Sequence, residues 1–198
     1  MDDSPARIDL ESLRAELRQL KQERDALAAR VRELEQQSTS VAAAAPTEVG
    51  RFEDAFRIEQ SRAKRQRFAL SLALVELDDL QATRDRLGHA AGEDVLNHLG
   101  AHLEASLRPT DVVSRIDGLA YGVLLTATNL EQALAAISRV QRELAEQPYA
   151  ASHAQAVVSF SAGIVQWRND EALGDLLSRA SRALGLAKKA GTGKAVVG

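Results

Sequence analysis

Arg115-Ile116-Asp117-Gly118-Leu119-Ala120-Tyr121 joins two short apolar runs, Val112–Val113 and Val123–Leu125. A glycine in a short break between two apolar runs is typical of a hairpin tip, because glycine adopts turn conformations that other residues disfavour. The stretch therefore predicts a β-hairpin over residues 112–126.

The segments on either side of this hairpin alternate between helical and strand periodicity. We predict helices over residues 52–65, 94–107, 130–146 and 172–189, and strands over residues 68–76, 157–166 and 195–197. A hairpin placed between helices favours an antiparallel-containing sheet covered by helices, in the α/β (α+β) class.

The hairpin resembles the signature hairpin of GGDEF domains, the diguanylate cyclase family, whose pattern is Arg-x-Gly-Gly-(Asp/Glu)-Glu-Phe. Arg115, Gly118 and the aromatic Tyr121 match this pattern. Asp117 stands at the first glycine, while Leu119 and Ala120 stand at the two acidic positions. The resemblance therefore indicates the fold of the family with a degenerate signature.

Other segments follow in the order of the same family. They are Gly88-His89-Ala90-Ala91-Gly92 at the start of a helix, Ser161-Ala162-Gly163 in a strand, and Ala187-Lys188-Lys189-Ala190-Gly191 near the C-terminus. The resemblance covers residues 51–198 and implies the palm-like mixed sheet of nucleotidyl cyclases, with helices covering it.

The departures from the pattern fall on chemistry-bearing positions. In the family, carboxylates hold the divalent cations that neutralise charge developing during cyclic di-GMP synthesis. These carboxylates map onto Glu76 and Leu119, and the guanine-reading asparagine maps onto Arg84, which has no hydrogen-bond acceptor. We therefore expect a chain that is not an enzyme, with no catalytic residue, no metal site and no cofactor.

A second pattern precedes the signature by five residues. Many family members carry an inhibitory product site, Arg-x-x-Asp, at this spacing, and the chain has Arg108-Pro109-Thr110-Asp111. The resemblance adds Arg139 and Arg62 as further arginines and implies cyclic di-GMP as a regulatory ligand. The alternative is structural: Arg108 would cap a helix C-terminus, and Asp111 would fix a turn.

The N-terminal segment carries a heptad pattern with apolar residues at steps of three and four. Its seam consists of Leu10, Leu13, Leu17, Leu20, Arg24, Leu27, Val31 and Leu34. We predict a parallel coiled-coil homodimer over residues 7–37, a linker over 38–50 and the degenerate GGDEF domain over 51–198. The alternative is a single amphipathic helix packed on its own domain.

The composition excludes several classes of function. The chain has 198 residues, a net charge of −3 and no cysteine, so it offers neither a disulfide framework nor a thiolate metal site. Mild acidity does not supply the basic field that nucleic-acid binding needs. No apolar run is long enough to span a bilayer, and we expect a cytoplasmic protein.

Together these features predict a dimeric receptor for cyclic di-GMP that signals to an unidentified protein partner. Two alternatives stay open. The first is a scaffold that binds no nucleotide and recruits a partner through the coiled coil, and the second is a residual cyclase.

Overall fold

The computed structural model of the chain describes residues 19, 21, 48–146, 149–151, 154–156 and 158–198. The predicted coiled-coil segment lies outside the described residues, apart from Gln19 and Lys21. The chain divides into two compact units, Met1–Pro46 and Thr47–Gly198.

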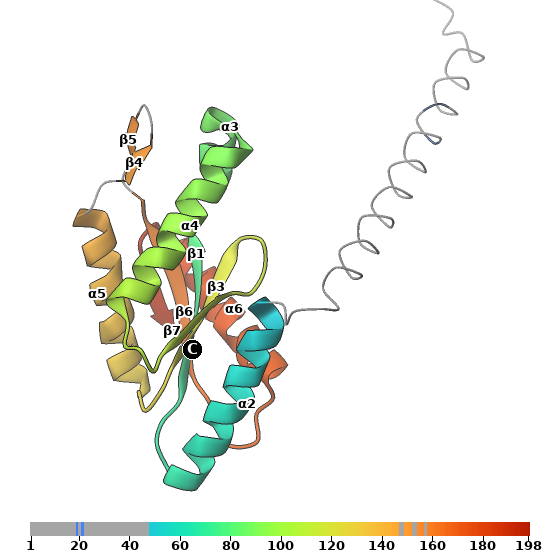
Figure 1. Cartoon of the computed structure of the whole chain (residues 1–198), viewed down its shortest axis with the longest axis vertical. Coiled ribbons are helices and arrows are strands. Elements are labelled where there is room, and N and C mark those ends of the chain that lie inside the picture. The colour runs from blue at the N-terminus through green and yellow to red at the C-terminus, as the bar shows by residue number, and fades with distance from the viewer. Residues whose placement is uncertain (1–18, 20, 22–47, 147–148, 152–153, 157) are drawn as a thin grey trace, which may run out of the picture. The chain divides into compact units, whose positions relative to one another are not determined.

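The second unit alternates helices and strands (Figure 1). Its helices are α2 (Glu48–Gln66), α3 (Leu80–Leu87), α4 (His89–Ser106), α5 (Leu130–Glu146) and α6 (Leu173–Ala190). Its strands are β1 (Ser71–Leu77), β2 (Val112–Arg115), β3 (Ala120–Leu125), β4 (Tyr149–Ala151), β5 (Ala154–Ala156), β6 (Phe160–Gln166) and β7 (Ala195–Val197).

A five-stranded sheet in the order β2-β3-β1-β6-β7 forms the centre of this unit. The pairs β2–β3, β3–β1 and β1–β6 are antiparallel, while β7 runs parallel to β6. β4 and β5 form a separate two-stranded hairpin. The predicted mixed sheet covered by helices is therefore confirmed.

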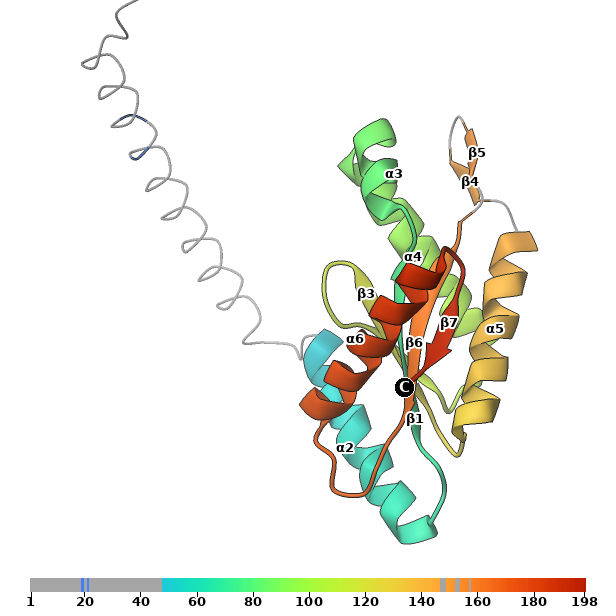
Figure 2. The ribbon, with the colours of Figure 1, turned by 180° about the vertical axis from the view of Figure 1, so that it is seen from behind.

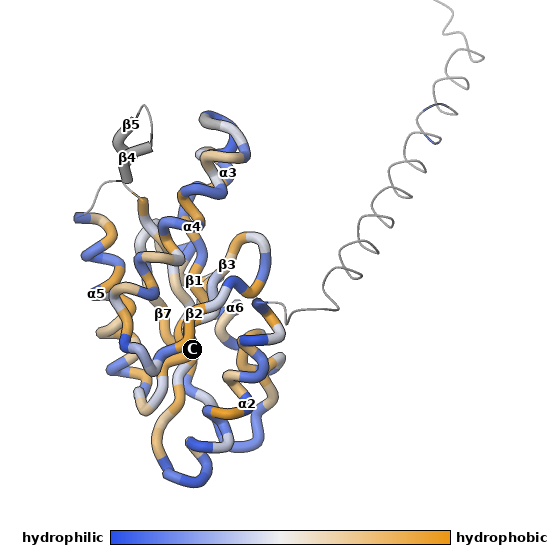
Figure 3. Tube along the Cα trace, viewed as in Figure 1, coloured by the Kyte–Doolittle hydropathy of each residue, from blue (hydrophilic) through white to orange (hydrophobic). Residues whose placement is uncertain are grey.

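Alternating side chains of the strands divide the core into two layers, because successive residues of a strand point to opposite faces. On β1, Ala73, Val75 and Leu77 pack with α4 and α5. Leu72 on the same strand packs with α2 and α6 on the other face. Figure 2 shows α6 crossing the sheet on this second face. In Figure 3 the central strands are mainly hydrophobic, whereas the helices alternate between the two colours.

Most predicted elements agree with the structure, and α5 and β7 agree in both bounds. Other bounds differ: α2 begins at Glu48, inside the predicted linker 38–50, and β1 and β6 each begin three residues later than predicted. α4 begins at His89 instead of Asp94, and the short helix α3 and the β4–β5 hairpin were not predicted. Asp79 stands at the N-cap of α3, but it is in a left-handed conformation with φ 53° and its side chain makes no cap hydrogen bond.

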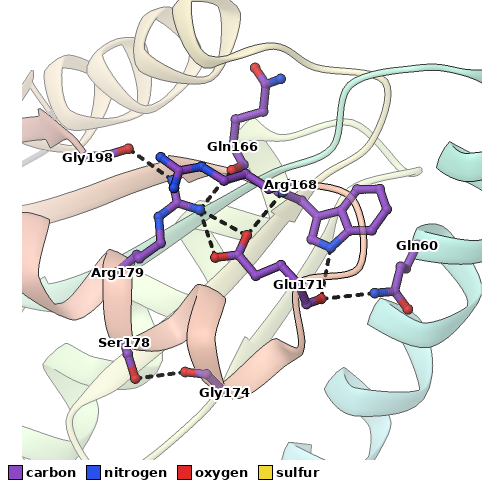
Figure 4. Close-up of polar contacts among 9 residues, drawn as sticks. Gln60, Gln166, Arg168, Glu171, Gly174, Ser178, Arg179 and Gly198 are labelled. Atoms are coloured by element: carbon purple, nitrogen blue, oxygen red, sulfur yellow. Dashed lines mark hydrogen bonds and ion pairs between the residues drawn. The ribbon is translucent and has the colours of Figure 1, made fainter.

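A cluster of polar contacts fixes the loop between β6 and α6 (Figure 4). The Arg179 guanidinium lies 2.9 Å from both carboxylate oxygens of Glu171, with side chains only 13% and 10% exposed. The Glu171 carbonyl accepts hydrogen bonds from Gln60 on α2 and from the indole of Trp167. This loop therefore joins α2 to α6.

Replacing Arg179 with alanine should lower the free energy of unfolding by about 3 kcal/mol, because a largely buried Glu171 would lose its partner. Urea denaturation measures this loss. Arg182→Ala on the exposed side of α6 is the matched control, and we expect a change within about 0.5 kcal/mol. Equal stability of the two variants would contradict this account of the loop.

Within the residues that the structure describes, no helix combines the length and the apolar character needed to cross a membrane.

Candidate functional site

The tip of the β2–β3 hairpin is held by Asp117. Its Oδ1 accepts hydrogen bonds from the backbone N–H groups of Leu119 and Ala120, both at 2.8 Å. An aspartate that accepts from backbone groups two and three residues later stabilises a tight turn. Asp117 therefore shapes the turn, a role that the sequence prediction did not include.

Arg115 connects the hairpin to α4. It donates one hydrogen bond to Glu93 at 2.9 Å and another to the Gly118 carbonyl. Arg84 on α3 donates to the other oxygen of Glu93 at 2.8 Å. The hydrogen bond from Arg115 lowers the pKa of Glu93 most; burial opposes this, and the bond from Arg84 adds to it. One carboxylate thus ties α3, α4 and the hairpin together.

Gly92 makes room for this arrangement. A Cβ atom at position 92 would lie 2.5 Å from Cγ of Arg84, so the side chain of Arg84 lies directly over the glycine. Gly88, with φ 89°, ends α3 and precedes α4, in a conformation that favours glycine. The backbone conformation at Gly88 and the close approach of Arg84 at Gly92 therefore explain why both positions hold glycine.

A small cavity of about 210 Å³ opens beside the hairpin tip. Glu76, Arg84, Leu119 and Lys188 are among the residues that line it. Lys188 forms an ion pair with Glu76. The structure thus brings Glu76 and position 119 together, as the resemblance implied. Ala120 and Tyr121 are buried, and the Tyr121 hydroxyl donates to the Leu96 carbonyl at 3.0 Å.

Asp79 also lines this cavity, but within the described residues no three His, Cys, Asp or Glu side chains are grouped so that they could hold a metal ion. Glu76 is paired with Lys188, and Leu119 offers no ligand atom. The nearby Asp78 accepts hydrogen bonds from the hydroxyls of Ser159 and Ser161 and from the Gly193 N–H, at 2.7 to 2.8 Å. Sequence reasoning missed the role of Asp78, which joins β1, β6 and the turn before β7.

A larger cavity of about 540 Å³ lies where α4 ends, beside α5. Arg108, Asp111 and Arg139 line it, together with the small side chains of Ala135 and Ala136. Asp111 accepts hydrogen bonds from its own turn, at Arg108 N, and from Thr126 N at the end of β3. Asp111 therefore fixes the position of the turn, as the structural alternative proposed.

The two arginines of this cavity differ in their contacts. Arg139 donates to the Ser106 carbonyl at the end of α4 at 2.9 Å and lies 3.7 Å from Glu143. The exposed side chain of Arg108 has no hydrogen bond or ion pair within the described part of the chain. Arg108 thus presents a guanidinium whose donors are available to an anion or to the edge of a base.

Arg62 does not join this group. It lies on α2 and pairs with Glu59 at 2.6 Å, and it does not line the cavity of Arg108. The resemblance gave Arg62 as a further arginine of the ligand site, but the structure places it apart from the cavity, because α2 packs on the opposite face of the sheet from α5.

Comparison with known proteins identifies the family. A family model described as "Diguanylate cyclase, GGDEF domain" matches residues 50–194. Diguanylate cyclase DgcP from Pseudomonas aeruginosa is 34% identical over 137 residues, which cover 68% of this chain and 20% of DgcP. The chain thus spans about a fifth of the length of that relative.

Solved structures share the fold. The GGDEF domain of YfiN, also called TpbB, from P. aeruginosa is 26% identical with a TM-score of 0.69, covering 74% of this chain and 92% of that one. The coiled coil and GGDEF domain of DgcB from Caulobacter crescentus, in complex with c-di-GMP, is 17% identical with a TM-score of 0.70, covering 90% of this chain and 99% of that one.

These findings contradict the expectation that the chain is not an enzyme. That expectation was based on Leu119 and Ala120 in the hairpin and on Arg84 outside it. The family model covers residues 50–194, and both it and the relative that matches over 137 residues are named as diguanylate cyclases. Glu76 and Lys188 are also retained in the cavity beside the hairpin. Departures at single positions are less informative than a match along the whole domain, and the chain belongs to the GGDEF domain family.

Proposed function

We propose that this GGDEF domain is a receptor for cyclic di-GMP and binds it in the cavity of Arg108, Asp111 and Arg139. The observation that carries the proposal is the placement of two arginines on one cavity of about 540 Å³. The Arg108 side chain makes no hydrogen bond or ion pair with another described residue. A volume of this size is typical of ligand pockets.

The chemistry of these side chains suits the ligand. A guanidinium can donate two parallel hydrogen bonds to O6 and N7 of guanine, or to a phosphate. Arg108, in the turn after α4, and Arg139, on α5, supply two such groups. Asp111 is already occupied by two backbone N–H groups, so we assign it the role of holding the turn, with the arginines making the main contacts.

The complex of DgcB with c-di-GMP supports this proposal, because that protein has the same fold and binds the dinucleotide. Titration calorimetry with cyclic di-GMP tests it directly. We expect saturable heat with a Kd of about 1 µM or tighter, a binding free energy of about 8 kcal/mol. No heat and no spectral change at saturating ligand would contradict the receptor hypothesis and favour the alternative, a scaffold that binds no nucleotide.

We infer a homodimer from the heptads of residues 7–37. Replacing Leu17 and Leu20 with lysine places charges in the apolar seam, so sedimentation should show a monomer. Arg18→Lys, outside the seam, is the control and should leave the dimer unchanged. A dimer that persists in the double variant would contradict assembly through these heptads.

The names of the relatives favour a second candidate, the synthesis of cyclic di-GMP from GTP. Leu119 lines the cavity with Glu76, and Ala120 pairs with Glu76 in the strand register, so Leu119→Glu and Ala120→Glu place carboxylates beside Glu76. Divalent cations prefer carboxylate oxygens. We expect the double variant to form dinucleotide at least tenfold faster than the native chain. Leu119→Gln with Ala120→Gln is the control of matched size.

Chromatography after incubation with GTP and Mg²⁺ measures the product. Equal rates in the glutamate and glutamine variants would contradict the assignment of position 119 to this chemistry. Dinucleotide made by the native chain would support the second candidate directly.

A further inference from the structure

A groove runs along the outer edge of the sheet at β2. Its volume is about 550 Å³, and all four residues of β2 line it together with residues of α2 and α4. Because β2 is the first strand in the sheet order and pairs only with β3, its other side has no neighbouring strand among the described residues. The groove therefore follows the free edge of β2.

The register shows which backbone groups face this groove. Ile116 donates its N–H to the Ala120 carbonyl, so hydrogen-bonded pairs continue at Ser114 opposite Gly122 and at Val112 opposite Leu124. In the intervening pairs the N–H and C=O groups point away from the partner strand. Val113 and Arg115 thus direct their backbone groups outward, where the described part of the chain supplies no partner.

The two helices that border β2 form the walls of the groove. α2 contributes Glu48 and Arg51, and α4 contributes Asn97 and Glu104. α2 is anchored to the strand because the Ser114 hydroxyl donates to the Glu48 carbonyl at 2.9 Å. A helix on each side leaves room for one extended chain in the plane of the sheet and restricts sheet growth beyond it.

The charges of the walls favour a basic occupant. The exposed side chains of Glu48, Arg51 and Glu104 make no hydrogen bond or ion pair with any other described residue. The remaining cation, Arg115, is already paired with Glu93 at 2.9 Å. Two carboxylates and one guanidinium are therefore unpaired, and the walls of the groove carry a small excess of negative charge.

We propose that this groove binds an extended peptide segment of a partner protein, which adds to β2 as an outer strand and carries a Lys or Arg side chain that meets Glu104. Main-chain hydrogen bonds to Val113 and Arg115 supply affinity, and the acidic wall supplies selectivity. Four residues of β2 accommodate about 13 Å of extended peptide. The site lies on the edge strand and shares none of its residues with the cavity of Arg108.

Amide exchange by NMR tests whether the edge is open. In the free full-length chain, the amides of Val113 and Arg115 should exchange at least tenfold faster than that of Ser114, which pairs with β3. Protection of all three amides to the same level would overturn the proposal, because another segment or a second copy of this chain would then cover the edge. Sedimentation would distinguish these two occupants.

Selection from a phage-displayed library of random heptapeptides tests the ligand. Val113→Pro removes an outward N–H without removing a bond of the β2–β3 ladder, a position where proline is tolerated in edge strands. Val113→Ala keeps the N–H and is the matched control. Peptides selected on the native chain should contain Lys or Arg, bind Val113→Ala with nearly native affinity, and bind Val113→Pro at least tenfold more weakly.

Two further measurements do not depend on the proline variant. Glu104→Gln should weaken binding of the selected peptides several-fold. Methylation of the peptide nitrogens that face β2 should weaken it at least tenfold, while methylation of the alternate nitrogens should not. No enrichment in the selection, equal binding to Val113→Pro, or no effect of methylation on either set would each overturn the proposal.

Discussion

Replacing Arg108 with alanine is expected to weaken the binding of cyclic di-GMP about a hundredfold. The guanidinium lines the proposed cavity, and no described residue engages it in a hydrogen bond or ion pair, so its donors are free for the ligand. Loss of a charged, bidentate contact removes about 3 kcal/mol, or two factors of ten in Kd.

Calorimetry on two further arginine variants tests whether the loss of affinity is specific to the cavity of Arg108. Arg139→Ala should weaken binding about tenfold, because Arg139 lines the same cavity but also donates to the Ser106 carbonyl. Arg142→Ala, an exposed arginine on the same helix, should leave the affinity unchanged. If Arg108→Ala and Arg142→Ala bind with equal affinity, the ligand does not use this cavity.

The second large effect concerns the fold. Gly163→Ala should lower the free energy of unfolding by about 3 kcal/mol, the range typical of overpacking against atoms that cannot move aside. A Cβ atom at position 163 of β6 would lie 2.1 Å from the Ala180 carbonyl oxygen and 2.3 Å from the Leu184 nitrogen. Both are backbone atoms of α6, so the whole helix must shift.

Gly185→Ala on the same helix is the matched control. Nothing lies within 4 Å of a Cβ atom at that position, so the substitution should stabilise the chain by about 0.5–1 kcal/mol through helix propensity alone. Urea denaturation measures both variants. A Gly163→Ala protein as stable as the native chain would show that α6 does not approach β6 this closely.

Several parts of the fold follow from local patterns. The α5 helix was predicted at its observed bounds because its apolar positions recur at helical spacing and become its buried face, including Ile137 and Leu144. The hairpin over residues 112–126 was predicted from one glycine between two apolar runs. The cavity residues Arg108, Asp111 and Arg139 were also predicted, but from a family resemblance.

Other features depend on residues far apart in the sequence. Asp78 meets Ser159 and Ser161 across β1 and β6, and no local pattern indicates that contact. The α3 helix is short, and Arg84 ties it to α4 through Glu93. Arg62 was expected at the Arg108 cavity, yet it lies on α2, which covers the opposite face of the sheet. The non-enzyme prediction was wrong because it gave departures at single positions, such as Leu119 and Arg84, more weight than the similarity of the whole domain to diguanylate cyclases.

The sequence alone indicated the family by resemblance, the mixed sheet and the approximate positions of most helices and strands, because periodicity and turn chemistry act over a few neighbouring residues. The open edge of the sheet and the cavity residues depend on the order of the strands in the folded domain. This order places β2 at the edge of the sheet with outward-facing backbone groups, and it sets Arg108 and Arg139 on one cavity. Such contacts arise from packing between distant segments, which the local pattern of the chain does not encode.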